Sequence, residues 1–232
     1  MKKAFLIILV VVSCIASCQE YMTLDEIYSK YNKGNVSYNS LDCEVTPLYF
    51  EGNISDTSFY KLNIQKEQYI YIKVDKGDEQ KDILLVKDRE ILICTEMNGN
   101  NINLDLDVNQ IEAFGIEFFN KKYICLITGG TGLYKSGSFQ EIRFYILIDL
   151  NTPIGVVTAW SRANSEHSFI NISNDDNIDF LQLVNNPDVN NRYFIKASTI
   201  SSGKLNPMNR NNLNIELEKS KNGGYKIINN VK

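Results

Sequence analysis

The sequence is poor in residues that carry chemistry in enzymes and metal sites. Its 232 residues include one histidine, one tryptophan, five cysteines and four prolines. A Ser-His-Asp or Cys-His hydrolase would have to use that single histidine, His167, because a general base must deprotonate the nucleophile. Its neighbours, Ser165-Glu166-His167-Ser168, lack the nucleophile-elbow pattern. The sequence therefore predicts a surface histidine and no catalytic residues.

Basic residues are slightly fewer than acidic ones. Lys and Arg number 24 against 28 Asp and Glu, which gives a net charge of −4. Phosphate binding requires clustered Lys and Arg, and no basic stripe is present. This composition excludes nucleic acid as a partner. It also argues against electrostatic docking of the whole chain on anionic lipid.

The first residues are typical of an exported, lipid-anchored protein. Lys2 and Lys3 precede the apolar run Ala4–Val12, which is too short to span a bilayer and fits a signal-peptide core. The run leads through Ile15-Ala16-Ser17 to Cys18. This pattern resembles a bacterial lipoprotein signal with its lipobox. The resemblance implies that Cys18 receives a diacylglycerol, becomes the mature N-terminus and is then acylated on its amine, for example with palmitate.

Three acyl chains would hold the chain firmly at a membrane, since each buried CH₂ contributes roughly 0.8 kcal/mol and stable anchoring needs two chains. Gln19 follows Cys18 in place of the aspartate that retains some lipoproteins in the inner membrane, so we expect the outer membrane of a bacterial cell envelope. The alternatives are a plain secreted protein cut near Ser17 or a buried N-terminal helix. We expect a signal peptide over 1–17, a tether and short helix over 18–40, and a β domain over 41–232.

Three cysteines remain beyond Cys18, an odd number. Cys94 and Cys125 lie in strand-like apolar runs and are expected to be buried free thiols, which behave as small hydrophobes. One disulfide with a leftover thiol, drawn from these two and Cys43, is the alternative. No CxxC spacing or neighbouring histidine indicates a metal site built from cysteines.

A capping box predicts one helix near the start of the mature chain. Thr23 stands at the cap with Glu26 three residues later, and Leu24, Ile27, Tyr28 and Tyr31 share a helical face. We expect a helix from Leu24 to Tyr31, ended by Gly34 in a left-handed cap.

From about Leu48 the hydrophobic period becomes two, which indicates strands. Residues 60–64 and 70–74 predict one hairpin, and 83–86 and 91–95 another. Further strands are expected at 102–108, 123–128, 144–149, 154–159, 180–184, 193–197, 213–217 and 225–228. Those at 123–128, 144–149 and 154–159 are apolar enough to be central strands. We expect a mainly β fold, an antiparallel sandwich or curved meander with a short N-terminal helix, and loops at 129–136 and 202–214.

Two features indicate a binding surface or carbohydrate chemistry. Tyr69 and Tyr71 share a strand face with Lys73, so they are expected to be exposed, where they could stack on sugars, anchor a protein partner or strengthen strand pairing. Carboxylate pairs can hydrolyse glycosides. The acids that could form such a pair are Asp105, Asp107, Glu112 and Glu117. Acid pairs are common by chance in an acidic chain, and solvated strand faces explain these acids.

The segment Asn171–Phe180 is the best candidate for a metal site. It resembles a degenerate form of the calcium loop of FG-GAP and VCBS repeats. The resemblance implies a calcium site with the side-chain ligands Asn171, Ser173, Asp175 and Asp179, because calcium prefers oxygens at alternate positions of a tight loop. The alternative is a plain Asx-rich turn between two strands.

Taken together, the lipobox, the Asn-, Lys- and Ile-rich β domain and the degenerate Asp loop resemble small uncharacterised lipoproteins of Bacteroides-type bacteria. We expect a non-catalytic, lipid-anchored binding or interaction protein of the cell envelope, whose partner is an envelope protein. A surface glycan-binding or glycan-processing lipoprotein is the alternative. No cofactor beyond calcium is expected.

Overall fold

The computed structural model describes residues 21–49, 56–76, 79–86, 89–93, 96–97, 100–101, 105–107, 110–133, 139–151, 155–163, 165–186, 188–201, 203–208 and 213–231. The expected signal and Cys18 lie outside these residues, so the lipid anchor stays a prediction. In the ranges just given, no helix is both long and apolar enough to cross a bilayer.

The described chain is mainly antiparallel β-structure with a short N-terminal helix, which confirms the predicted fold class. The N-terminal sheet has the order β2 (Cys43–Leu48), β3 (Thr57–Ile64), β4 (Glu67–Lys76), β5 (Glu79–Val86), β6 (Arg89–Ile93). The middle sheet has the order β1 (Val36–Leu41), β10 (Glu112–Phe118), β11 (Lys121–Leu133), β12 (Phe139–Asp149), β13 (Val156–Ser161), and β9 (Asp105–Leu106) pairs with β11.

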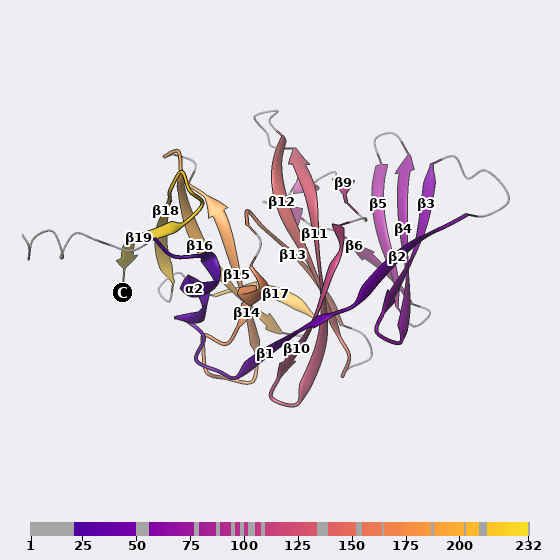
Figure 1. Cartoon of the computed structure of the whole chain (residues 1–232), viewed down its shortest axis with the longest axis horizontal. Helices are drawn as coiled ribbons and strands as arrows, with labels where there is room; N and C mark the ends of the chain where they lie inside the picture. The colour runs from indigo at the N-terminus through magenta and orange to yellow at the C-terminus, as the bar shows by residue number, and fades with distance from the viewer. Residues whose placement is uncertain are drawn as a thin grey trace, which may run out of the picture.

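The C-terminal sheet completes the fold. Its order is β14 (Phe169–Ile170), β15 (Ile178–Asn185), β16 (Arg192–Ser201), β18 (Asn214–Lys219), β19 (Tyr225–Val231), and β17 (Lys204–Pro207) pairs with β16. A separate pairing joins β7 (Glu96–Met97) to β8 (Asn100–Asn101). Figure 1 shows the N-terminal sheet at one end of the long axis, the middle sheet at the centre and β18 and β19 at the other end.

The two central strands of the middle sheet, β11 and β12, are buried on both faces over their apolar segments 123–128 and 144–148. Ile124 and Leu126 of β11 belong to a core cluster with Leu62 and Leu84 of the N-terminal sheet. Their neighbour Cys125 belongs to a second cluster, with residues of β14 and β15. This double burial confirms the prediction for β11 and β12, whereas β13 forms an edge of the sheet.

The hairpin of β3 and β4 corrects the expected exposure of Tyr69 and Tyr71. Both side chains are only 1% exposed and pack toward the middle sheet. A two-residue turn joins the strands, so that Leu62 pairs with Tyr69, and paired residues share a sheet face. Since Leu62 faces the core, Tyr69 and Tyr71 must face it too.

The helix α2 (Leu24–Ser29) confirms the capping box but ends two residues before the expected Tyr31. The Thr23 hydroxyl accepts the Glu26 N–H, and the Glu26 carboxylate accepts the Thr23 N–H. Leu24, Ile27 and Tyr28 pack in a third cluster with β15, β16, β18 and β19. The helix therefore covers one face of the C-terminal sheet.

Several segments differ from the expectation. The strands β1, β2 and β10 were not expected, and the expected division at residue 40 falls within β1, which pairs with β10. Gly129–Leu133 continue β11, and Lys204–Pro207 form β17, so these parts of the expected loops are strands. At Gly129 a Cβ would lie 2.8 Å from the Arg143 guanidinium, so glycine gives that side chain room in the sheet.

Two of the three cysteines beyond Cys18 fall in the described residues. Cys43 is partly buried, Cys125 is buried, and both are free thiols. Burial raises the pKa of each thiol. Cys94 lies outside the described residues, so its pairing stays a prediction.

We expect the effect of the Glu26 cap on stability to disappear in acid. Hydrogen bonds from the Thr23 N–H and hydroxyl, with the charge of Lys30, lower the pKa of Glu26 below its ordinary value of 4.5. Because the folded pKa is lowered, the ionised cap stabilises the fold above the unfolded pKa, and this stabilisation is lost as the pH falls through the folded pKa. Urea unfolding should separate the wild type from Glu26→Gln at neutral pH, with a difference that shrinks below about pH 4. An equal difference in stability between the two proteins at neutral pH and below about pH 4 would contradict this role of Glu26.

Candidate functional site

The segment expected to bind calcium lies between β14 and β15 and contacts the N-terminal part of the chain. The Lys33 N–H donates to the Asn171 carbonyl at 2.7 Å, and the Asn171 N–H donates to the Asn32 side chain at 3.0 Å. A Cβ at Gly34 would lie 2.8 Å from the Asn171 Cβ. Gly34 is therefore needed for this close approach. Its φ is not positive, so the expected left-handed cap at Gly34 is wrong.

The side chain of Asn171 closes this loop from inside. Its amide nitrogen donates to the carbonyl oxygens of Asp175 and Asn177, and its amide oxygen accepts the Asn174 N–H. Asn174 has a φ of 58°, a region that Asn tolerates better than most residues. The Asp175 carboxylate accepts the Asn177 N–H at 2.9 Å. These are the contacts of an Asx-type turn.

Asp179 is the one fully buried carboxylate among the expected ligands. It accepts the Ile172 N–H at 2.8 Å, the Ser173 N–H at 3.4 Å and the Thr199 hydroxyl at 2.7 Å. A buried carboxylate needs such donors to offset its lost hydration. Asp179 thereby ties the loop to β16.

This arrangement does not fit a calcium site. Calcium needs six to eight oxygens directed at one point. Here Asn171 directs its nitrogen toward the loop carbonyls, Asp179 already accepts three hydrogen bonds, and Ser173 is exposed. Within the described ranges, no group of three or more His, Cys, Asp or Glu could hold a metal ion. Calcium binding stays a prediction that the geometry does not support.

His167 lies in a short 3₁₀ helix, η2 (Glu166–Ser168), beside Ser165 and Asp25. The Ser165 hydroxyl donates to the Asp25 carboxylate at 2.5 Å, and the His167 backbone N–H lies 3.2 Å from Ser165 Oγ. The imidazole ring packs on Tyr38, with centroids 5.0 Å apart. A triad needs the base side chain within hydrogen-bond reach of the nucleophile. These contacts instead cap η2 and join it to α2.

Two of the four acids named for carbohydrate chemistry, Glu112 and Glu117, are exposed. Glu117 forms an ion pair with Lys122 at 3.2 Å, and both side chains are half exposed or more. Such surface pairs contribute little to stability. Asp107 is partly buried, and the side chain of Asp105 lies outside the described ones.

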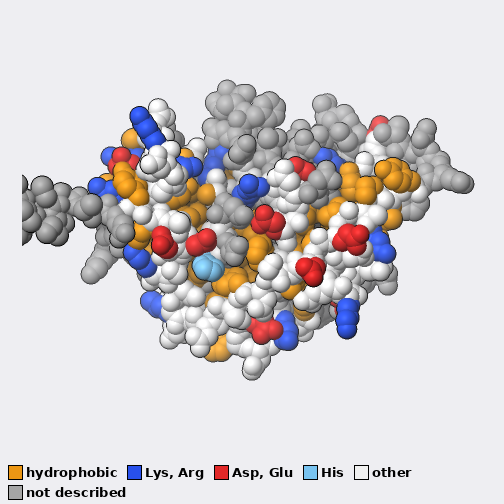
Figure 2. Space-filling view, in the orientation of Figure 1, with side chains coloured by type: hydrophobic (Ala, Val, Ile, Leu, Met, Phe, Trp, Pro, Cys, Tyr) orange, Lys and Arg blue, Asp and Glu red, His pale blue; other side chains and the backbone are white. Residues whose placement is uncertain are grey.

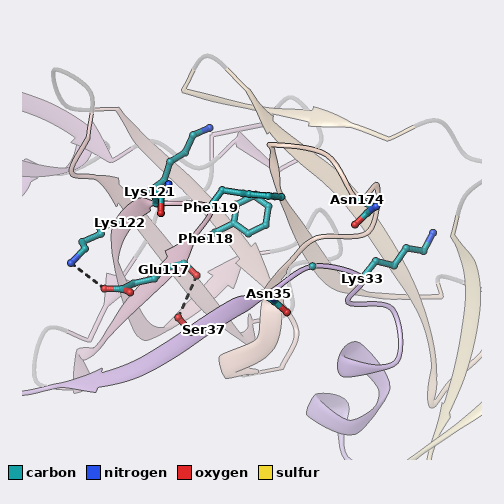
Figure 3. A pocket seen from close by; sticks show the side chains of 11 residues that line it. Lys33, Asn35, Ser37, Glu117, Phe118, Phe119, Lys121, Lys122 and Asn174 are labelled. Atoms are coloured by element: carbon teal, nitrogen blue, oxygen red, sulfur yellow. Dashed lines mark hydrogen bonds and ion pairs between the residues drawn. The ribbon is translucent and has the colours of Figure 1, made fainter.

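A surface pocket of about 670 Å³ lies where the β10–β11 hairpin meets the start of β1 (Figure 3). Its lining comes from Lys33, Gly34, Asn35 and Ser37, from Glu117–Lys122 of the hairpin, and from Asn174 of the loop described above. We call it the Phe119 pocket. Phe118 and Phe119 lie near its centre, with Lys121 and Lys122 on one side and Lys33 and Asn174 on the other (Figure 3).

Phe119 is held in an unfavourable backbone conformation. Phe119 and Asn120 form the two-residue turn between the paired Phe118 and Lys121, with φ of 49° and 66°. These angles define a type I′ turn, which favours Asn and Gly. A left-handed conformation costs other residues about 1–2 kcal/mol. The residue is nevertheless 55% exposed, although its ring contacts Phe118 edge-on with centroids 4.6 Å apart, so core burial does not explain why a phenylalanine stands here.

The pocket is positively charged and polar around this ring. Lys33, Lys121 and Lys122 are exposed, and Glu117 is the one acidic residue of the lining. The Lys121 ammonium donates to the Asp176 carbonyl at 3.1 Å, which leaves its positive charge without a carboxylate in that contact. The lining contains no His, Cys or Asp. The pocket therefore presents an aromatic ring, ammonium groups and side-chain amides.

No protein-family model, curated protein or solved structure matches the chain. The site is therefore interpreted from its own geometry.

Three lining residues were singled out from the sequence for other reasons: Asn174 in the Asx-rich segment, Glu117 among the acids and Gly34 as a helix cap. The turn residues of the hairpin and the lysines of the lining were not predicted. The signal for them was Asn120 between two strand-like runs, a residue type enriched in tight turns. This turn signal was missed because Phe119, which precedes Asn120, fits the pattern of the preceding strand.

We expect Asp179→Ala to lower the free energy of unfolding by about 3 kcal/mol. The substitution leaves the Ile172 N–H and the Thr199 hydroxyl without their acceptor, and each such buried group costs about 1–3 kcal/mol. Asp176→Ala, on the exposed side of the same loop, should change stability by less than about 0.5 kcal/mol. Urea denaturation measures both, and similar effects for the two variants would contradict the structural role of Asp179.

Titration calorimetry of the mature chain with calcium should show no binding heat into the millimolar range. The reason is that the loop oxygens already accept hydrogen bonds within the protein. A saturable heat that disappears in Asp175→Ala would restore the calcium hypothesis.

Proposed function

We propose that this chain is a non-catalytic binding protein, held in a bacterial cell envelope by lipid on Cys18, that binds a protein partner through the Phe119 pocket. The observation that carries the binding role is Phe119, exposed and left-handed at the tip of a hairpin. Backbone strain kept at an exposed position is a reason to infer function.

The pocket chemistry favours a partner that is acidic and partly apolar. Exposed aromatic side chains are enriched among residues that dominate protein interfaces, where they fill pockets on the partner. Lys33 and Lys121 would attract Asp or Glu around such an anchor and repel basic surfaces, whereas Lys122 is already paired with Glu117. An envelope protein with an apolar patch rimmed by carboxylates has these properties.

The scaffold supports such a role because the hairpin continues the middle sheet. Residues Glu112–Phe118 of β10 pair throughout with β11, and Phe118 is buried in the second cluster. Sites on strands of a packed scaffold hold their geometry better than sites on long loops. Little ordering of the hairpin would therefore be needed on binding.

Glycan binding is the second candidate, with narrower support. One of its two grounds, exposed Tyr69 and Tyr71, is removed by their burial. The Phe119 ring with Asn35, Asn120 and Asn174 nearby still offers a stacking face and amide groups of the kind that sugars use. Binding of the mature chain on a glycan array, lost in Phe119→Asn, would favour this candidate.

We expect Phe119→Asn to weaken partner binding without destabilising the fold. Asn suits the first position of a type I′ turn, so the free energy of unfolding should stay within about 1 kcal/mol of the wild type. Affinity for a partner captured from envelope extract should fall at least about tenfold, as for the loss of an interface anchor. Pull-down followed by affinity measurement on the isolated partner tests this.

Matched charge reversals separate the pocket from general charge effects. Lys121→Glu should weaken the same partner, whereas Lys66→Glu, in the exposed β3–β4 turn, should not. Equal binding by the wild type, Phe119→Asn and Lys121→Glu would contradict a role for the pocket.

A further inference from the structure

The proposed lipid lies very close to a fixed point of the fold. Met22 and Tyr225 each donate a backbone N–H to the other's carbonyl at 2.8 Å, and Thr23 then caps α2. Three residues, 19–21, separate Cys18 from Met22. Because an extended chain spans at most about 3.6 Å per residue, the Cα of Cys18 stays within about 14 Å of the Cα of Met22.

That fixed point lies at one end of the molecule. Tyr225 begins β19, which is the edge strand of the C-terminal sheet. Figure 1 shows β18, β19 and α2 at one end of the long axis and β3, β4 and β5 at the opposite end. The anchor therefore emerges from an end and not from the middle of the long side.

We infer that the short tether orients the protein, so that the β18–β19 end faces the lipid headgroups and the N-terminal sheet points away from the bilayer. This inference rests on the proposed lipidation of Cys18. It adds a surface to that proposal, which we call the anchor face and which consists of exposed residues at this end of the chain: Tyr21 beside Met22, and Lys219, Lys221 and Ile228 of the β18–β19 hairpin.

The exposed residues of the anchor face suit a headgroup region. Tyr21 is 51% exposed although it packs against the β18–β19 turn, where a Cβ at Gly224 would lie 3.0 Å from its Cβ. Ile228 is 38% exposed, and Lys219 and Lys221 are exposed. Tyrosines are enriched at membrane interfaces, and lysines are attracted to anionic lipid. Figure 2 shows Lys and Arg side chains together with apolar ones at this end.

Charge alone does not account for the orientation. The chain is acidic, and Glu218, the neighbour of Lys219 in the sequence, is exposed. The length of the tether is the stronger constraint, because it applies whatever the lipid charge. The Phe119 pocket lies on the β10–β11 hairpin of the middle sheet, so this orientation leaves it open to a partner.

Spin-labelled lipid headgroups test the orientation in the lipidated full chain. Trp160, the one tryptophan of the chain, is first replaced by Trp160→Phe. A single tryptophan reporter is then introduced by Lys221→Trp. The matched control carries its reporter in the N-terminal sheet, by Lys66→Trp. Each protein is reconstituted in vesicles of phosphatidylethanolamine and phosphatidylglycerol that carry a headgroup spin label. We expect fluorescence at position 221 to be quenched at least about threefold more strongly than at 66, since the tether holds position 221 near the lipid.

A variant with a longer tether tests whether the short tether causes the orientation. Twelve Gly and Ser residues inserted between Gln19 and Glu20 should reduce quenching at position 221 toward the level at 66, because the flexible segment then reaches farther. Equal quenching at both positions with the native tether overturns the orientation, and undiminished quenching with the spacer overturns the tether as its cause. A chain that does not float with the vesicles at all overturns the lipid anchor itself, which distinguishes that failure from a wrong orientation.

Discussion

Burial of the two central strands of the middle sheet on both faces is the constraint on which the rest of the structure depends. β11 and β12 pair from Tyr123 with Asp149 to Leu133 with Phe139, and successive residues of β11 alternate between the two core clusters. Backbone groups covered on both sides must find their hydrogen bonds within the sheet. The hairpin that carries Phe119 is an extension of this paired sheet, so the exposed ring is displayed from a rigid base.

The sequence predicted the structural features that depend on local patterns. The capping box needs only Thr23 and Glu26, and the structure forms it as expected. The apolar runs of β11 and β12 predicted central strands because double burial removes alternation. Tyr69 and Tyr71 were assigned to the wrong face because Lys73 was taken to mark the polar one. The turn at Gln65 and Lys66 sets the register, and that register places both tyrosines beside residues already in the core.

The candidate site could not be predicted because it joins segments far apart in the sequence. Lys33, Phe119 and Asn174 meet only after β1 pairs with β10 and the loop after β14 packs on the segment at Gly34. The Asp-rich loop illustrates a second limit. Its residue types suit calcium, but Asn171 can direct either an oxygen or a nitrogen inward, and the hydrogen bonds of the folded loop decide between them. Composition therefore identified the loop without determining its chemistry.

Location and recognition are linked in this account by the few residues between Cys18 and Met22. The lipid would determine the location of the protein, and the short tether would determine its orientation on the membrane. The Phe119 pocket would determine which partner it binds. Mass spectrometry of the mature N-terminal peptide from the native host decides whether Cys18 carries lipid. We expect a peptide that begins at Cys18 and carries diacylglycerol with an acylated amine; a mature chain with an unmodified amino terminus would exclude the lipid anchor.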